Sequence, residues 1–375
     1  MNPIPILDLA RARQRIDVAL TARWQTILDS NAYILGPEVK EFERAFTGFL
    51  GARAAVGVAN GTDALVIALR ALDLEPGAEV LVPAFSFFAT AEAVFLAGGV
   101  PVFCDIDETT YNLDPAELDR RATAKTAGVI GVHLYGRPFD VEAVSAVCAR
   151  RSWFLIEDAA QAHGAKRRGR RVGTLGNLAA WSFYPTKNLG CFGDGGAVSG
   201  MDEALMQRVH RLANHGQIER YLHVEIGTNS RLDSLQAAVL NCRLPLLDED
   251  NATRRRLAAL YHQALAGVGD LRLPPDDPAD EVVYHQLTIA TARRDALQEF
   301  LKSKGVASAV HYPSPLHRQP AMARVAHPPQ PVDEGLGRAE RAASEVLCLP
   351  MYPELESAAV ERAAAAVRDF YGARG

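Results

Sequence analysis

The sequence predicts an α/β protein organised around a mostly parallel sheet. Short apolar runs of strand length alternate with longer stretches of helical spacing, a pattern typical of parallel sheets with crossover helices. Two of the runs lead into residues capable of chemistry. Residues 153–158 end in two carboxylates, and residues 178–184 precede a lone lysine, Lys187. Because open α/β sheets bind ligands beyond the carboxyl ends of their strands, these residues indicate a site.

Composition and charge exclude several classes of function. The chain has 375 residues, which allows two or three domains, and 48% of them are hydrophobic, so a large core is available. The net charge of −5 argues against a nucleic acid partner, because such proteins carry a basic surface. No apolar run is long enough to cross a bilayer, and prolines and charges stand where a signal peptide would be apolar. The five cysteines form no CxxC pair, which predicts a reduced, cytoplasmic protein without a metal cluster.

The first elements of the chain are expected to be helices. Charged and apolar residues alternate at helical spacing over 8–28, and Gly36-Pro37 is a helix-start signal. The helix that follows places three phenylalanines on one stripe, which is more typical of core than of a ligand site: Phe42, Phe46 and Phe49.

A phosphate site is predicted at the start of the next helix. An apolar segment at 56–60 leads into a helix over 61–72, which begins with Gly61, Thr62 and Asp63. Free backbone N–H groups and the positive end of the helix dipole favour phosphate at such a position. Alternatively, Thr62 or Asp63 only caps the helix, and both roles are compatible.

Further strands are expected at residues 79–83, 100–105 and 129–134. Phe87 belongs to a cluster of phenylalanines that follows the first of them, where at most one ring would stack on a flat cofactor. A core phenylalanine is the default interpretation. No GxGxxG fingerprint opens any of these units, which argues against a nicotinamide enzyme.

Lys187 lies between the apolar run 178–184 and a loop that contains four glycines. Burial disfavours the charged ammonium, and a neutral amine is a nucleophile that forms a Schiff base with an aldehyde. Upstream, Asp158 closes its run beside Glu157. Pyridoxal 5'-phosphate (PLP) enzymes need such a pair, a lysine for the aldehyde and an acid against the pyridinium nitrogen. The alternatives are a surface lysine in a turn and carboxylates that only cap the next helix.

The remaining elements suggest a smaller second domain. The basic run 166–171 is expected to be a hairpin turn with solvated arginines, with an anion site as the alternative. Helices are expected from Asn229 to Leu244 and over 246–266, and the domain boundary is placed between them, giving domains 1–245 and 246–375. A strand over 281–290, a helix over 293–304 and a loop over 328–331 follow.

Several blocks of the sequence also carry a family resemblance. They are spread over most of the chain: NGTDAL (60–65), VHLYG (132–136), EDAAQAHGA (157–165), SFYPTKNLG (182–190), GDGGAV (193–198), NSRLDSLQAAVL (229–240) and HYPSPLH (311–317). The chain resembles the DegT/DnrJ/StrS family of PLP-dependent sugar aminotransferases. The resemblance implies the aspartate-aminotransferase type I fold, in which a large domain with a mixed, mainly parallel seven-stranded sheet is followed by a smaller C-terminal α+β domain.

The resemblance also implies roles for individual residues. Lys187 would carry PLP and Asp158 would contact the ring nitrogen, while Gln161 would contact the phenolic oxygen and Phe87 would stack on the ring. The PLP phosphate would be bound by the turn at Gly61, Thr62 and Asp63, by Ser182, and by Asn229 of the other subunit of a homodimer. His311 resembles a family residue near the sugar. Without the resemblance, Ser182 reads as a turn residue, Asn229 as a helix cap and His311 as structural.

The implied function is PLP-dependent transamination of a nucleotide-linked keto-sugar with L-glutamate as the amino donor. The motifs look most like those of enzymes acting on a dTDP-linked 3-keto-6-deoxyhexose. A 4-keto-sugar and a UDP-linked 3-keto-sugar are the alternative substrates. Dehydratase relatives carry histidine in place of the lysine, and a non-catalytic regulatory protein would have lost it, so the intact Lys187 argues against both.

Overall fold

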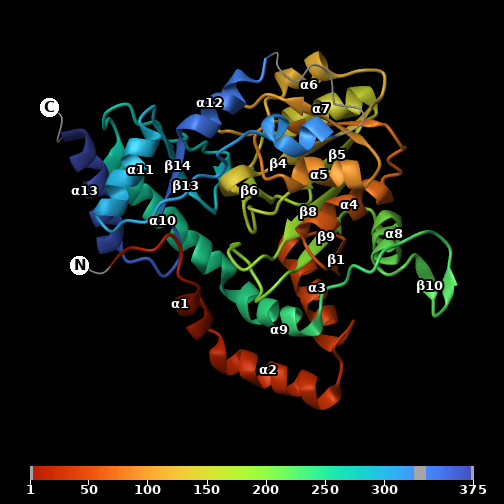
Figure 1. The fold of residues 1–375 in the computed structure, drawn as a ribbon. Helices are drawn as coiled ribbons and strands as arrows, with labels where there is room; N and C mark the ends of the chain where they lie inside the picture. Colours follow the sequence, from red (N-terminus) through yellow and green to blue (C-terminus); the bar gives the residue numbers. More distant parts are fainter. Residues whose placement is uncertain (1–2, 325–334, 373–375) are drawn as a thin grey trace.

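The fold is described here from a computed structural model, which covers residues 3–324 and 335–372. Its centre is a seven-stranded sheet with the order β1-β9-β8-β5-β4-β2-β3 (Figure 1). Only β9 runs antiparallel to its neighbours, and the other pairings are parallel. The expected mixed, mainly parallel sheet is therefore confirmed. Its strands are β1 (Ala54–Val58), β2 (Glu79–Pro83), β3 (Val100–Cys104), β4 (Thr126–Val132), β5 (Phe154–Asp158), β8 (Leu178–Ser182) and β9 (Gly196–Gly200).

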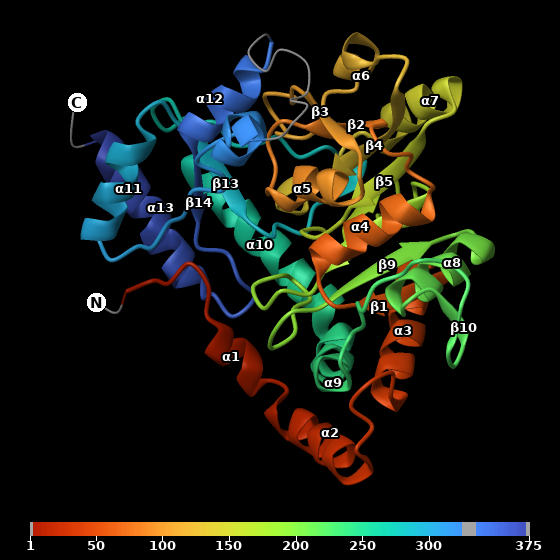
Figure 2. The same cartoon turned by 45° about the vertical axis from the view of Figure 1, so that its right-hand side comes forward.

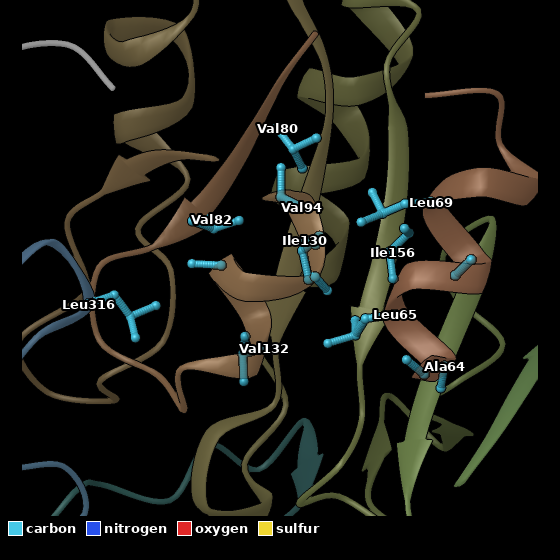
Figure 3. Packing of buried hydrophobic residues seen from close by; sticks show 14 of the residues in the cluster. Ala64, Leu65, Leu69, Val80, Val82, Val94, Ile130, Val132, Ile156 and Leu316 are labelled. Atoms are coloured by element: carbon cyan, nitrogen blue, oxygen red, sulfur yellow. The ribbon is translucent and has the colours of Figure 1, made fainter. Parts of the chain in front are cut away.

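One face of the sheet packs against three helices, and these are α4 (Gly61–Ala71), α5 (Ala89–Leu96) and α8 (Glu203–Ala213). Figure 3 shows this packing: Leu65 and Leu69 of α4 lie against Ile156 of β5. Successive strand residues point to opposite faces, so every second residue of a strand enters this cluster. The result is a layer of buried apolar side chains beneath the carboxyl ends of the central strands.

The other face is covered by α3 (Pro37–Leu50), α6 (Ala116–Arg121), α7 (Val141–Arg151) and α9 (Ser234–Arg243). Here Phe42 and Phe46 of α3 pack on Trp181 and Phe183 around the end of β8. The phenylalanine stripe expected in α3 is thus core, with Phe49 only half-buried. The stretch 8–28, expected to be helical, forms two helices, α1 (Leu9–Gln14) and α2 (Asp17–Ser30).

The C-terminal residues build a further apolar core of their own around a two-stranded sheet. Its elements are α10 (Leu247–Leu265), β13 (Leu287–Ala290), α11 (Arg294–Ser303), β14 (Val346–Leu349) and α13 (Ser357–Gly372), whereas the buried alanines of α12 (Gly337–Glu345) pack into the core of the large sheet. Ile4 joins this core and forms a bridge with Val306, so the N-terminal end lies beside the C-terminal elements (Figure 2). The domain boundary predicted at residue 245 falls in the short turn Leu244–Leu246, which joins α9 to α10. The boundary itself stays a prediction.

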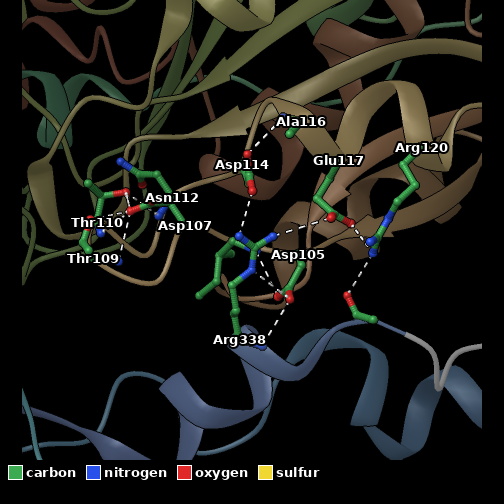
Figure 4. Close-up of polar contacts among 12 residues, drawn as sticks. Asp105, Asp107, Thr109, Thr110, Asn112, Asp114, Ala116, Glu117, Arg120 and Arg338 are labelled. Carbon is green, nitrogen blue, oxygen red and sulfur yellow. Dashed lines mark hydrogen bonds and ion pairs between the residues drawn. The ribbon is translucent and has the colours of Figure 1, made fainter.

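A polar cluster ties α12 to the large sheet (Figure 4). Asp105, directly after β3, accepts hydrogen bonds from the N–H groups of Arg338 and Ala339 at the start of α12. The Arg338 guanidinium in turn contacts Asp105, Asp114 and Glu117 at 3.2, 2.8 and 3.5 Å. Asp105 and Glu117 are buried, so this arginine compensates carboxylates that have left water.

Two local predictions were wrong, and a third is not tested. The helix after Asn229 begins only at Ser234, with Asp233 as its N-cap, so Asn229 does not cap it. The run 281–290 holds two separate strands, β12 (Asp280–Glu281) and β13, because Tyr284 has a positive φ that ends an extended run. The loop expected at 328–331 lies outside the described residues.

The basic run forms the predicted hairpin, made of β6 (Lys166–Arg167) and β7 (Arg170–Arg171). Its arginines are not all solvated, however. Arg167 is buried and contacts four carboxylates brought from other segments, on Asp140, Glu142, Asp277 and Asp280. The expectation of a wholly solvated run was therefore wrong, because the sequence around the hairpin contains none of these partners.

Candidate active site

A cavity of about 770 Å³ opens at the carboxyl ends of the central strands, within the size range of small-molecule sites. The end of β5, the end of β8 and the start of α4 form its floor. The segment 309–312 and Met351 contribute from the C-terminal part, and Ile6 and Leu7 from the N-terminal end. Of the ten residues expected in a site, eight line it: Gly61, Thr62, Phe87, Asp158, Gln161, Ser182, Lys187 and His311.

Lys187 lies in the turn that follows β8, where its N–H donates to the Tyr184 carbonyl at 2.8 Å. Burial lowers the pKa of Lys187 to about 8, although the negative charge of Asp158 opposes the shift. Half of the amine is therefore neutral near pH 8, whereas an ordinary lysine is almost fully charged there. The neutral form is the nucleophile.

Asp158 ends β5 and is almost fully buried. Burial raises the pKa of Asp158, and a hydrogen bond from Thr90 Oγ1 to Oδ2, 2.9 Å long, opposes the shift by favouring the ionised carboxylate. Since an ionised carboxylate only accepts hydrogen bonds, Thr90 is the donor. Ser86 Oγ lies 2.9 Å from Thr90 Oγ1 and donates to it in turn. A carboxylate held in this way is ready to face a cation.

The start of α4 presents free donors to the cavity. Asn60 is the N-cap, and its side chain accepts from the Asp63 N–H at 2.8 Å. The N–H groups of Gly61 and Thr62 precede the first intrahelical bond and keep no partner within the helix. Glycine is needed here because a Cβ at Gly61 would lie 2.7 Å from Ser182 Cβ. Ser182 and the helix start are thus in direct contact.

Gln161 and Phe87 form part of the wall near Tyr312. Gln161 Oε1 accepts from the Tyr135 N–H at 2.7 Å, and its Nε2 donates to the Tyr312 hydroxyl at 3.0 Å. Both ends of the amide are therefore fixed. The Phe87 side chain is 55% exposed and its ring lies 5.8 Å from that of Tyr312. Phe87 is not the core residue that its sequence alone suggests.

A buried amide network supports the segment next to Lys187. Asn188 Nδ2 donates to Asn251 Oδ1 and to the Val283 carbonyl, both at 3.0 Å. Its Oδ1 then faces His285 Nδ1 at 3.1 Å, so this ring nitrogen carries the proton. His285 lines the cavity, and burial holds its pKa well below the usual range. The ring is neutral at physiological pH.

Two expected residues lie outside the cavity lining. Asp63 belongs to the first turn of α4, but its N–H is already used by Asn60. Asn229 is exposed and pairs with Asn214, beyond the hairpin of β10 (Gln217–Glu219) and β11 (Leu222–His223). Within the subunit, Asn229 contributes nothing to the lining.

The family model for the DegT/DnrJ/EryC1/StrS aminotransferase family matches residues 14–368. This chain belongs to that family. A "dTDP-3-amino-3,4,6-trideoxy-alpha-D-glucose transaminase" of Streptomyces venezuelae is 44% identical over 367 residues, covering 98% of this chain and 96% of the relative. A "Pleiotropic regulatory protein" of Geobacillus stearothermophilus is 42% identical over 371 residues, covering 98% of each.

The fold agrees with this membership. The crystal structure of S. venezuelae DesV "in complex with ketimine intermediate" has a TM-score of 0.95 at 43% identity and covers 99% of both chains. The expected type I aminotransferase fold is confirmed, and the family is that of PLP-dependent sugar aminotransferases. Every helix in the described ranges is too short or too polar to span a bilayer.

Several residues that line the cavity, or that contact a residue of its lining, were missed in the sequence. Thr90 lies in an apolar helix without any chemical motif, and Arg254 lies in a run of three arginines that reads as a solvated helix face. Tyr312 was within reach of sequence reasoning, because it directly follows His311 in the HYPSPLH block. His285 lies inside the run 281–290, and the interpretation of that run as one continuous strand gave no reason to single it out.

Proposed function

We propose that this protein transfers an amino group from L-glutamate to a dTDP-linked 3-keto-6-deoxyhexose and so produces a 3-amino sugar. The observation that carries the proposal is the presence of Lys187 and Asp158 in one cavity, beside the unpaired N–H groups at the start of α4. The relative from S. venezuelae, with its named 3-amino-sugar product, supports the choice of substrate.

The cavity fits PLP at each end. The start of α4 and Ser182 form a glycine-lined cradle suited to the phosphate, in which an added Cβ would collide. Asp158 would face the ring nitrogen and Gln161 the phenolic oxygen, while Phe87 would lie on the ring. The bound cofactor supplies an electron sink that stabilises negative charge at the carbon losing its proton.

In the proposed reaction, Lys187 would hold the cofactor through Nζ until the amino donor takes its place. The freed Nζ would then act as the base that accepts the proton from the donor Cα and as the acid that gives a proton back. Its pKa of about 8 suits this exchange, because a catalytic base works best when its pKa lies near the operating pH. Asp158 would stay negatively charged throughout, at the end of the cavity that faces the ring nitrogen. The keto-sugar receives the amino group by the same steps in reverse.

We also propose that the enzyme is a cytoplasmic homodimer with shared sites. Apolar side chains that a monomer would leave in water gather on the segment around β10 and β11, where Tyr221 is 80% exposed: Ile218, Tyr221, Leu222, Val224 and Ile226. Such patches mark interaction surfaces. The exposure of Asn229 near this segment is consistent with a role across the interface.

A second candidate function follows from the relative named a pleiotropic regulatory protein. A regulatory protein on this fold has no need of the lysine and carboxylate pair, yet both are present with their supporting hydrogen bonds. Catalysis therefore remains the better-supported function.

The test supplies L-glutamate with four sugars separately: the 3-keto and 4-keto dTDP-hexoses, a UDP-linked 3-keto-sugar, and a dTDP-sugar without a keto group as control. We expect the highest kcat/KM with the 3-keto dTDP-sugar. A higher kcat/KM with the 4-keto or UDP-linked compound would overturn the substrate. A protein that binds PLP and aminates none of them would favour the regulatory function.

A further inference from the structure

Arg254 is a buried cation in the wall of the cavity, and no carboxylate lies within ion-pair distance of it among the described residues. It is only 4% exposed. Its Nη1 donates to the carbonyls of Tyr284 and Met351 at 3.1 and 3.0 Å. Its Nε is buried without a hydrogen-bond partner.

The other buried arginines of the described chain differ from Arg254 in this respect. Arg137 pairs with Asp276, and Arg167 contacts several carboxylates. A guanidinium stays charged at neutral pH even where burial lowers its pKa, to about 10 in the case of Arg254. A buried charge is costly unless a counter-charge and hydrogen bonds compensate it. Asp250 and Glu354 attract the guanidinium only from beyond ion-pair distance, so an anionic ligand would add the direct counter-charge that Arg254 lacks.

The anchoring of Arg254 leaves a particular edge of the guanidinium unused. With Nη1 bonded to two carbonyls, Nε and Nη2 have no partner in the described residues. These two nitrogens form the edge of the fork that binds a carboxylate through two parallel hydrogen bonds. The two anchoring carbonyls belong to the C-terminal core, where Tyr284 and Met351 pack, whereas the phosphate cradle lies at the start of α4.

We propose that Arg254 binds a carboxylate group of the amino-acid donor, and of the 2-oxo acid that it becomes. This inference rests on the proposed transamination. The α-carboxylate is bonded to the carbon that reacts at Lys187, so the reaction itself brings it into this cavity. The diphosphate of a nucleotide sugar is separated from the keto carbon by the sugar ring and need not approach a buried arginine. Arg254 would thus select amino acids over simple amines.

The test uses the PLP-loaded enzyme and its variants Arg254→Met and Arg254→Lys. The matched control is Arg137→Met, which removes a buried arginine that lies outside the cavity. Calorimetry measures the affinity for glutarate, a dicarboxylate that has no amine to transfer. Single-turnover experiments measure separately the 2-oxoglutarate formed from L-glutamate and the amino sugar formed from the keto-sugar.

We expect Arg254→Met to weaken glutarate and L-glutamate binding by roughly 30- to 300-fold, the worth of hydrogen bonds between charged groups. The keto-sugar half-reaction should change by less than about threefold, and Arg254→Lys should recover part of the loss. Arg137→Met should leave both half-reactions within about threefold, after correction for any unfolded fraction.

Equal losses in both half-reactions would overturn the proposal, because they would assign Arg254 a structural role only. Unchanged glutarate affinity in Arg254→Met, or no glutarate binding by the unaltered enzyme, would also overturn it. Failure of the proposed function looks different. In that case no keto-sugar is aminated, while the dependence of glutarate binding on Arg254 can still be measured.

Discussion

Thr90 Oγ1 donates a hydrogen bond of 2.9 Å to Asp158 Oδ2, and both residues are buried. The bond joins α5 to the end of β5 and stabilises the ionised form of a carboxylate whose pKa burial would otherwise raise further. Ser86 Oγ in turn forms a hydrogen bond with Thr90 Oγ1. Because this second bond fixes the Thr90 hydroxyl, the carboxylate is fixed in orientation as well as in charge.

Replacement of Thr90 by valine removes this hydrogen bond while keeping the shape of the side chain. We expect PLP to bind roughly 10- to 100-fold more weakly and kcat/KM to fall by a similar factor, since a hydrogen bond to a charged group contributes roughly 1.5–3 kcal/mol. Equilibrium binding of PLP, followed by fluorescence, gives the first value. Thr90→Ser retains the hydroxyl and should behave nearly as the unaltered enzyme; a serine variant as weak as the valine variant would contradict this account.

The lowered pKa of Lys187 predicts how the cofactor-free protein takes up PLP. Raising the pH deprotonates the amine, and with a pKa of about 8 the neutral fraction grows about tenfold from pH 7 to pH 9. An ordinary lysine would gain about 100-fold over the same range. Stopped-flow measurement of the uptake rate distinguishes the two, and the reaction of PLP with free lysine corrects for titration of PLP itself. A rate that still rises steeply above pH 9 would refute the lowered pKa.

The cluster around Arg338 predicts a stability difference between two arginines of α12. Arg338→Met would leave the buried carboxylates of Asp105 and Glu117 without this cation, at a cost of about 1–3 kcal/mol in the free energy of unfolding. Arg341 contacts Glu108 at 3.9 Å, and both side chains are exposed, so Arg341→Met should cost less than about 0.5 kcal/mol. Denaturant unfolding of both variants measures the difference, and similar losses in the two would count against the buried cluster.

The proposed role of Asn229 across a dimer interface predicts complementation. Subunits carrying Lys187→Ala and subunits carrying Asn229→Ala should each be nearly inactive alone. A heterodimer of the two contains one site with both residues intact, so we expect up to half the activity of the unaltered dimer. Differently tagged subunits allow the heterodimer to be purified, and an inactive, correctly folded heterodimer would argue that each site is complete within one subunit.

The elements that sequence reasoning placed well are those whose evidence is local. Strand β5 and its terminal Asp158, and strand β8 and the turn to Lys187, follow from an apolar run and the residue types directly after it. The sequence cannot show which distant side chain will meet these residues. Thr90 is 68 positions from Asp158, and nothing in its own segment distinguishes it from a core threonine.

The misjudged segments failed for the same reason. Arg167 reads as solvated because its partners Asp140 and Asp280 come from other parts of the chain. Arg254 lies in the helix expected over 246–266, and nothing near it in the sequence indicates that it meets the carbonyls of Tyr284 and Met351. Charge near a residue in sequence does not reveal charge near it in space.

The participation of Ile6, Leu7 and Met351 in one cavity has a consequence for synthesis of the protein on the ribosome. All seven strands of the large sheet precede residue 245, but the wall at Met351 does not exist until more than 100 further residues have been translated. The N-terminal segment, including Ile4 with its partner Val306, must wait for the same residues. The nascent chain therefore acquires Lys187 and the phosphate cradle long before it can enclose a substrate, and the active site is completed only near the end of translation.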